Sequence, residues 1–230
     1  NITEKMFNLL SLCWDENPKK RPNFSEIYYH LTSDYSSYMN EPLDTDEIDN
    51  YRSHINGDPK TSNHFVLGNI YIDEKELNDL FFENKDYIKT NVNHPELSPK
   101  NTISESPYDK IFIVQNQNDQ KEYTMRTIKT DIFKRYQQMI LLRESLIQHK
   151  LQHRSILKFI GLNFQSFENN SKIKPSILTE FCPNYSLNKF MKENKNLTMT
   201  QKAILILGIA DGMRYIHGLN IIHGHLSPKC

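Results

Sequence analysis

Apolar residues recur at helical spacing near the start of the chain. Five of them follow one another at steps that place them on one side of a helix: Ile2, Met6, Leu9, Leu10 and Cys13. The pattern predicts an amphipathic helix that begins near Thr3, a residue suited to cap it. After a turn bracketed by Pro18 and Pro22, a second apolar face begins at Phe24. Such faces are stable only when another element covers them.

The pattern loosens between residues 32 and 96. Acidic residues gather at 41–58 and are interrupted by Pro42 and Gly57, which is typical of a linker. Residues 65–72 could form a short strand, and residues 73–88 have helical spacing. We therefore predict a linker or a small helical insert here.

Strand-like alternation returns at residues 123–129, where Met125, Thr127 and Lys129 share one face. A helix is then predicted over about 131–152, with Asp131 as its cap. Glu144 lies on the apolar stripe of this helix, and a carboxylate in such a place requires a counter-charge.

Two further strands are predicted at residues 163–167 and 176–180. Residues 200–217 then form a helix that is apolar on nearly all sides, which favours a place in a core. Gly218 is predicted to end it.

Composition excludes several classes of protein. Lys plus Arg and Asp plus Glu both number 28, so neither nucleic-acid binding nor a strongly acidic character is indicated. The three cysteines form no disulfide or zinc pattern, so no metal site is predicted and a reducing, cytoplasmic setting is favoured. No apolar run approaches the roughly 20 residues of a membrane span.

The last ten residues, 221–230, contain His223-Gly224-His225-Leu226-Ser227-Pro228-Lys229-Cys230. This segment resembles the catalytic loop of protein kinases, His-Arg-Asp-Leu-Lys-Pro-x-Asn. In that family the Asp receives the proton of the substrate hydroxyl and the Asn holds Mg²⁺. Here the matching positions are His225 and Cys230. The resemblance thus implies the protein-kinase-like α+β fold, with an antiparallel sheet in the N-lobe and mainly helices in the C-lobe, but without the catalytic carboxylate.

Other segments carry the same resemblance. Residues 123–129 are similar to the Val-Ala-Ile-Lys strand, which implies that Lys129 pairs with Glu144 and contacts ATP phosphates. Residues 177–187 look like the hinge, with Thr179 as gatekeeper and with Glu180 to Cys182 offering backbone groups to an adenine. The usual hinge glycine is Tyr185 here. His153 takes the place of a family histidine and is expected to be structural.

Residues 103–112 align with the glycine-rich loop, with Ile111 at its valine position. The three glycine positions hold Ser104, Ser106 and Asp109, so an ordinary hairpin and a phosphate-covering loop are both compatible with the sequence.

Residues 13–25 are similar to the closing segment of kinases, especially of the tyrosine-kinase-like branch. In that segment an arginine at the position of Arg21 is buried and pairs with a glutamate that this chain does not contain.

These likenesses predict pieces of two incomplete kinase-like domains. Residues 1–31 would end one domain, 32–96 would be the linker or insert, 97–180 would be a second N-lobe, and 181–230 its hinge and the start of its C-lobe. The order suits a tandem-kinase signalling protein better than a permuted domain, because the Asp-Phe-Gly and activation segments are not found.

Three functions follow as hypotheses. The second domain is a regulatory pseudokinase with at most weak ATP binding and a poor Mg²⁺ site, and this is the hypothesis that the substitutions favour. The alternatives are an active ATP-dependent protein kinase with a divergent loop and a non-kinase helical interaction module. Proteins are the expected partners or substrates. Whether the protein is an enzyme stays open, and this stretch alone is predicted to be inactive.

Overall fold

The computed structural model describes residues 2–55, 97–107, 109–128, 135–163 and 176–229. The chain divides into two compact units, which we treat separately. The helical unit comprises Asn1–Leu67, His153–Ile156 and Asn184–Cys230, and the sheet unit comprises Gly68–Gln152 and Leu157–Pro183.

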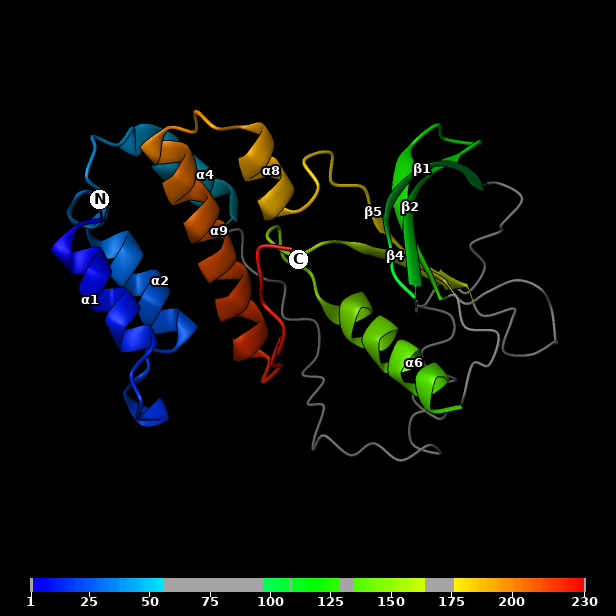
Figure 1. Cartoon of the computed structure of the whole chain (residues 1–230), viewed down its shortest axis with the longest axis horizontal. Helices are drawn as coiled ribbons and strands as arrows, with labels where there is room; N and C mark the ends of the chain where they lie inside the picture. Colours follow the sequence, from blue (N-terminus) through cyan, green and yellow to red (C-terminus); the bar gives the residue numbers. More distant parts are fainter. Residues whose placement is uncertain (1, 56–96, 108, 129–134, 164–175, 230) are drawn as a thin grey trace. The chain divides into compact units, whose positions relative to one another are not determined.

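The helical unit is built from short helices around one long helix (Figure 1). Its elements are α1 (Glu4–Cys13), η1 (Pro18–Lys20), α2 (Phe24–Ser33), α3 (Tyr35–Tyr38), α4 (Thr45–Ile55), α8 (Leu187–Glu193) and α9 (Met199–Gly218). Both α2 and α4 pack against α9. The N-terminal helices and a helix that begins at residue 199 therefore share one core.

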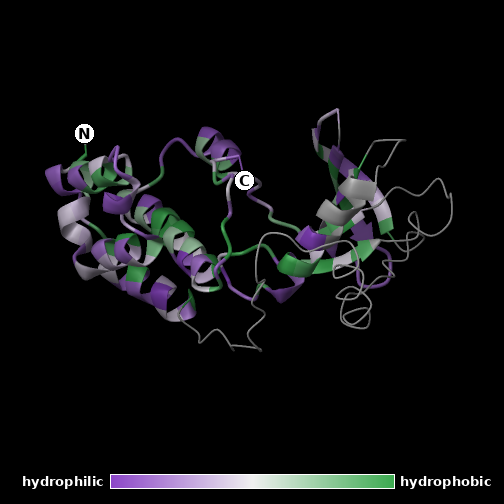
Figure 2. Cartoon of the chain, turned by 90° about the horizontal axis from the view of Figure 1, so that it is seen from below, coloured by the Kyte–Doolittle hydropathy of each residue, from purple (hydrophilic) through white to green (hydrophobic). Residues whose placement is uncertain are grey.

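That core buries one face of each contributing helix. Its fully buried members come from α1 to α4 and from α9: Met6, Leu9, Tyr28, Leu31, Tyr38, Ile48, Ala203, Leu207 and Ala210. Figure 2 shows hydrophobic and hydrophilic positions alternating around these helices, as burial on one face requires. Both the first helix and the 200–217 helix therefore have a covered apolar face in this shared core.

The four-part division proposed from the sequence stays a prediction. It was based on resemblance to kinase segments, whereas the two units are defined by which parts of the chain pack together. However, α4 lies within the segment predicted to be a linker, and its Ile48 is completely buried.

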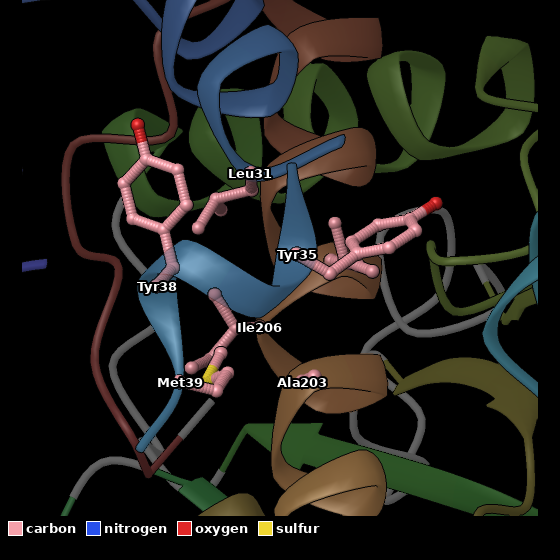
Figure 3. A pocket seen from close by; sticks show the side chains of 7 residues that line it. Leu31, Tyr35, Tyr38, Met39, Ala203 and Ile206 are labelled. Atoms are coloured by element: carbon pink, nitrogen blue, oxygen red, sulfur yellow. The ribbon is translucent and has the colours of Figure 1, made fainter. Parts of the chain in front are cut away.

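Helix α9 is less enclosed than its composition suggested. Ile206 and Ile209 are each 38% exposed, whereas Leu207 and Ala210 face the core. Beside Ile206 a small apolar pocket opens between α9 and the α2–α3 segment, lined also by Leu31 and Tyr35 (Figure 3). Helix α9 has apolar residues on nearly all sides but packs in the core on only part of its circumference, so some of these residues lie at the surface.

The helix ends differ in how well the sequence predicted them. Thr3 caps α1 as expected, since its hydroxyl accepts a hydrogen bond from the Met6 amide at 3.1 Å. Helix α9 ends at Gly218 as predicted, but Gly218 is not the left-handed capping residue. Asn220 adopts the left-handed conformation with φ of 59°, and the amides of Asn220 and Ile221 bond back to the His217 and Ile216 carbonyls. Asparagine replaces the usual glycine in this capping motif.

Arg21 is not the buried cation that the kinase closing segment implied. It is exposed, and its Nε donates to the Asp15 carbonyl oxygen at 2.9 Å. An exposed guanidinium stays hydrated, so it needs no buried carboxylate. Arg21 instead closes the turn around η1.

The sheet unit is an antiparallel sheet with a helix on it, as predicted (Figure 1). Its elements are β1 (Leu97–Glu105), β2 (Asp109–Asn116), β3 (Glu122–Ile128), α6 (Arg135–Lys150), β4 (Phe159–Asn163) and β5 (Ser176–Glu180), and the strand order is β1-β2-β3-β5-β4. Helix α6 packs against β4. The predicted strand at 176–180 is confirmed. The preceding strand, β4, shares Asn163 with the predicted strand at 163–167, and residues 164–167 lie outside the described residues.

Several predictions fall outside the described residues. These are the strand at 65–72, the helix at 73–88 and the cap at Asp131. Within the described part of the chain, no helix combines the length and apolar character that a bilayer crossing needs.

One titratable group makes the stability of the sheet unit depend on pH. The pKa of His149 on α6 is lowered, first by burial and then by the charge of Lys150. Its ring meets Phe159 edge-on at 6.0 Å. A lowered folded-state pKa means that stability is complete above the unfolded value of about 6.5 and is lost as pH falls below it.

We expect His149→Gln to flatten the fall in stability between about pH 7 and pH 5. Urea unfolding of both proteins across this range measures the difference. His54→Gln is the control, because His54 is exposed on α4. Identical pH slopes for the parent and His149→Gln would contradict the prediction.

Candidate functional site

The residues expected to surround a nucleotide lie on two units, so each half is described by itself. In the sheet unit, Ile111 on β2 pairs with Arg126 on β3, and Thr179 on β5 pairs with Thr124. Cross-strand partners and residues two apart share a face of a sheet. Ile111, Thr179 and Arg126 therefore lie on one face.

Glu144 finds its counter-charge on that face. Its Oε2 lies 2.5 Å from a terminal nitrogen of Arg126, and the side chains are 34% and 31% exposed, respectively. The argument that this carboxylate needs a cation is confirmed, and the described partner is Arg126. Lys129 lies outside the described residues, so its pairing with Glu144 stays a prediction.

Of the three residues predicted to share one face of this strand, Met125, Thr127 and Lys129, the first two are described, and they do share a face. Met125 and Thr127 lie on the face opposite Arg126, where Met125 packs with Val114 and Leu178. A one-residue change of register would exchange these faces. The pairing seen here fixes Arg126 rather than Thr127 beside Glu144.

The hinge residues are largely committed to the sheet. Thr179 is buried, and the Glu180 amide donates to the Lys158 carbonyl at 2.9 Å. The Glu180 carboxylate accepts from the Lys158 amide at 2.6 Å. Cys182 is exposed, and neither of its backbone groups bonds to another described residue. The backbone at Cys182 thus remains open to a planar ligand with donors and acceptors.

Partial desolvation and then the charge of Glu180 raise the pKa of the Cys182 thiol. A raised pKa keeps this group a neutral thiol rather than a nucleophilic thiolate.

The hairpin between β1 and β2 closes on itself. The Ser106 amide donates to the Asp109 carbonyl at 2.9 Å, and the Asp109 amide donates to the Ser106 hydroxyl at 3.0 Å. The Ser106 hydroxyl also lies 2.5 Å from the Asp109 carboxylate. The Ser106 and Asp109 amides are therefore used within the turn instead of facing a phosphate, and the Asp109 carboxylate lies beside them. Of the two possibilities left open by the sequence, the geometry supports the ordinary hairpin.

In the helical unit, the segment around His225 is exposed and short of acids. The His225 amide donates to His223 Nδ1 at 3.3 Å, and Gly224 between them has φ of 72°. From residue 212 to residue 230 the sequence contains no Asp or Glu. The segment thus offers imidazoles, a hydroxyl and an ammonium group, but no carboxylate.

This segment is anchored to the start of α8. The Pro228 carbonyl accepts from the Asn188 amide at 2.7 Å. Just before α8, Tyr185 has a positive φ of 55°, at the position where the family usually has glycine. Lys189 Nζ lies 3.4 Å from the centre of the Tyr185 ring, a cation–π contact that favours this conformation.

A family model for protein tyrosine and serine/threonine kinases matches residues 100–229, which is more than half of the chain. The chain belongs to this kinase family. Relatives include Fer-related kinase 1 of Caenorhabditis elegans, 24% identical over 139 residues, or 60% of this chain and 34% of that protein. The matching segment thus spans about a third of that relative.

Two other relatives match over shorter stretches. Ephrin type-A receptor 1 of Mus musculus is 36% identical over 90 residues, or 38% of this chain and 8% of that protein. Serine/threonine-protein kinase plk-2 of Caenorhabditis elegans is 32% identical over 98 residues, or 43% of this chain and 15% of that protein. The chain is therefore similar to a small part of each.

Kinases of this family use ATP with Mg²⁺. The exposed hinge backbone at Cys182 fits an adenine. The closed Ser106–Asp109 turn does not fit the phosphates, and the acid-free segment around His225 does not fit a hard cation that prefers oxygen ligands. The described residues of this kinase chain thus match the base of the nucleotide better than its charged end.

His153 is structural, as expected. Its Nδ1 accepts from the Ser155 amide at 3.1 Å, so Nε2 carries the proton and lies 3.1 Å from Asp211 Oδ2, although without good hydrogen-bond alignment. The ring stacks on Tyr215 at 4.8 Å. Asp211 is completely buried on α9 and also binds Arg214, whose Nε donates to it at 3.0 Å.

Sequence reasoning missed Asp211 and Arg126. An acid on a nearly continuous apolar helix is the same signal that identified Glu144, and applying it to α9 would have found Asp211. Arg126 carried no such signal, because neighbouring strand residues point to opposite faces and only the register decides which cation meets Glu144.

Proposed function

We propose that residues 97–230 belong to a regulatory pseudokinase domain that binds ATP weakly and transfers no phosphate. The observation that carries the proposal is the absence of any carboxylate from residues 212–230, where His225 stands at the catalytic position. A carboxylate both accepts the substrate proton and keeps a negative charge when it does not hold that proton. Neutral imidazole accepts a proton but supplies no such charge.

The phosphate side supports the same proposal. The Ser106 and Asp109 amides are used within the hairpin, and Asp109 adds negative charge where a triphosphate would lie. Catalysis of phosphoryl transfer rests on positioning and on electrostatic stabilisation of the transition state. Losing both the cradle and the carboxylate removes contributions that act there.

The remaining groups fit a binding role. The backbone at Cys182 is open, and the Glu144–Arg126 pair holds α6 to β3. We propose that this domain acts through protein partners in signalling and in the cytoplasm. We further propose that residues 1–31 are the end of a preceding kinase domain of the tyrosine-kinase-like branch.

A phosphotransfer assay with radiolabelled ATP tests the proposal. The full chain, and in parallel a longer natural protein that contains it, is assayed with Mg²⁺ and a general protein substrate beside Lys129→Met and His225→Asp. We expect the parent and Lys129→Met to be equal and at background. His225→Asp alone is expected to restore nothing, because the closed hairpin remains.

ATP binding is measured by thermal shift with and without Mg²⁺. We expect a small stabilisation that Mg²⁺ does not increase, since the cation has no suitable ligands in residues 212–229. Robust transfer that Lys129→Met abolishes would overturn the proposal and show that another group acts as the base.

A further inference from the structure

Tyr35 lies beside a charged pair from a neighbouring helix. It is the first residue of α3, and its hydroxyl oxygen accepts a hydrogen bond from Arg52 on α4 at 2.6 Å. The same hydroxyl donates to Asp49 at 3.3 Å. Arg52 and Asp49 are themselves 3.5 Å apart. The tyrosine oxygen therefore meets both a cation and an anion.

The Arg52 guanidinium has hydrogen-bonding capacity left over. Its Nε is buried and has no hydrogen-bond partner among the described residues, while a terminal nitrogen contacts Tyr35 and the guanidinium also bonds Tyr28. A phosphate group has three strong acceptor oxygens and binds arginine through paired hydrogen bonds. Phosphate on the Tyr35 oxygen would bring these acceptors to a donor that a single hydroxyl cannot satisfy.

Asp49 does not prevent this exchange. Its side chain is 63% exposed, so it can turn into solvent when a phosphate takes its place beside Arg52. The two carboxylate contacts that it loses are surface interactions of low energy. The new contacts are charge-assisted and join a doubly negative group to arginine.

Tyr35 is also accessible to an enzyme. The side chain is half-buried, and Figure 3 shows its hydroxyl pointing away from the apolar pocket. Helix α3 is a single turn of four residues, and residues 39–44 after it contain no helix. Opening one turn breaks few hydrogen bonds, so the segment can extend into a kinase cleft.

Neighbouring tyrosines lack this combination. Tyr38 is buried and has Lys5 over its ring at 4.8 Å. Tyr28 also hydrogen-bonds Arg52, but it is buried, with the Arg214 guanidinium 4.4 Å from its ring centre. Tyr29 is 68% exposed, and its only described ring contact is His30 at 6.2 Å. Tyr29 thus serves as a matched exposed tyrosine without an arginine.

We propose that Tyr35 is a phosphorylation site, modified in trans by an ATP-dependent protein tyrosine kinase, and that Arg52 holds the phosphate. The Tyr35 oxygen forms a bond to the γ-phosphorus of ATP, the bond from that phosphorus to the bridging oxygen breaks, and ADP leaves. The phenol proton passes to the carboxylate base of the modifying kinase. The product fastens α3 to α4 through the Arg52–phosphate contact.

The test compares two sites in one chain. The full chain is phosphorylated by a tyrosine kinase with ATP, and the loss of phosphate from Tyr35 and Tyr29 under a general phosphatase is followed by mass spectrometry of peptides. We expect phosphate on Tyr35 to be removed about fivefold more slowly than that on Tyr29, because Arg52 shields it. Tyr35→Phe confirms the peptide assignment.

Variants then test whether Arg52 holds the phosphate. Arg52→Gln is expected to remove the protection, and Arg52→Lys to keep part of it, because lysine retains the charge without the paired geometry. Asp49→Asn is expected to increase the protection, since it removes a competing anion. Because Asp49→Asn leaves Arg52 in place, it tests the proposal even if the Arg52 variants do not fold.

Equal removal rates at Tyr35 and Tyr29 in the parent would overturn the proposal. So would unchanged protection of Tyr35 in folded Arg52→Gln, as judged by circular dichroism, or failure to modify Tyr35 when Tyr29 is fully modified.

Discussion

Replacing Ile48 by alanine is expected to lower the free energy of unfolding of the helical unit by about 3 kcal/mol. Ile48 lies on α4, is 0% exposed and belongs to the core formed with α9. Truncating a fully buried isoleucine loses its transfer free energy and leaves a cavity. Urea unfolding followed by far-ultraviolet circular dichroism measures the change.

Ile222→Ala is the matched control, because the same side chain is 81% exposed there. Its expected cost is below about 0.5 kcal/mol. The comparison decides whether the acidic segment after residue 41 is a passive linker or a part of the folded unit. Equal effects of Ile48→Ala and Ile222→Ala would show that α4 does not stay on α9 in solution.

Asp211→Ala is expected to cost about 2–3 kcal/mol. This carboxylate is completely buried and lies between His153 and Arg214. Removing it takes away the carboxylate that lies 3.1 Å from His153 Nε2 and releases Arg214 from its place over the Tyr28 ring. Because the Arg214 side chain is 41% exposed and can rehydrate, the cost stays below that of breaking a fully buried pair.

Asp46→Ala supplies the control for this substitution. Asp46 is exposed in the first turn of α4, where its loss costs less than about 1 kcal/mol through the helix dipole. A double-mutant cycle with His153→Ala isolates the pair. A coupling energy near zero between positions 153 and 211 would contradict the view that these side chains support each other.

The sheet and its helix were predictable because their residues repeat with a clear period. Alternation fixed the strand through Met125, and the stripe containing Glu144 fixed α6. The resemblance of the flanking segments to kinase motifs supported the strand at 176–180. Local periodicity could not supply the register, and so the cation that meets Glu144 was named from the resemblance and not from the pattern.

Helix α4 was missed for a different reason. Between residues 45 and 55 only Ile48 and Ile55 are both apolar and buried, and acidic residues surround them. Such a segment has too little apolar surface to predict burial on its own, and α9 provides the remaining surface. Packing with a distant element overrode the composition.

The site could be predicted in outline and not in detail. Sequence positions identified the hairpin, the hinge and the segment of His225, because motif spacing survives substitution. Whether the Ser106 and Asp109 amides face a ligand or each other depends on the turn conformation, which the sequence left open. The geometry shows the Ser106 amide donating to the Asp109 carbonyl and the Asp109 amide donating to the Ser106 hydroxyl.

The shared core of the helical unit also bears on how the protein is made. Helices α1 to α4 end at residue 55, and α9 begins at residue 199. A ribosome adding about 5–20 residues per second leaves the early helices without this partner for roughly 7–30 s. Leu31 on α2 and Ile48 on α4 are apolar during that wait and lack the helix against which α2 and α4 finally pack. Newly made chains should therefore depend on chaperones that hold exposed apolar helices until synthesis reaches α9.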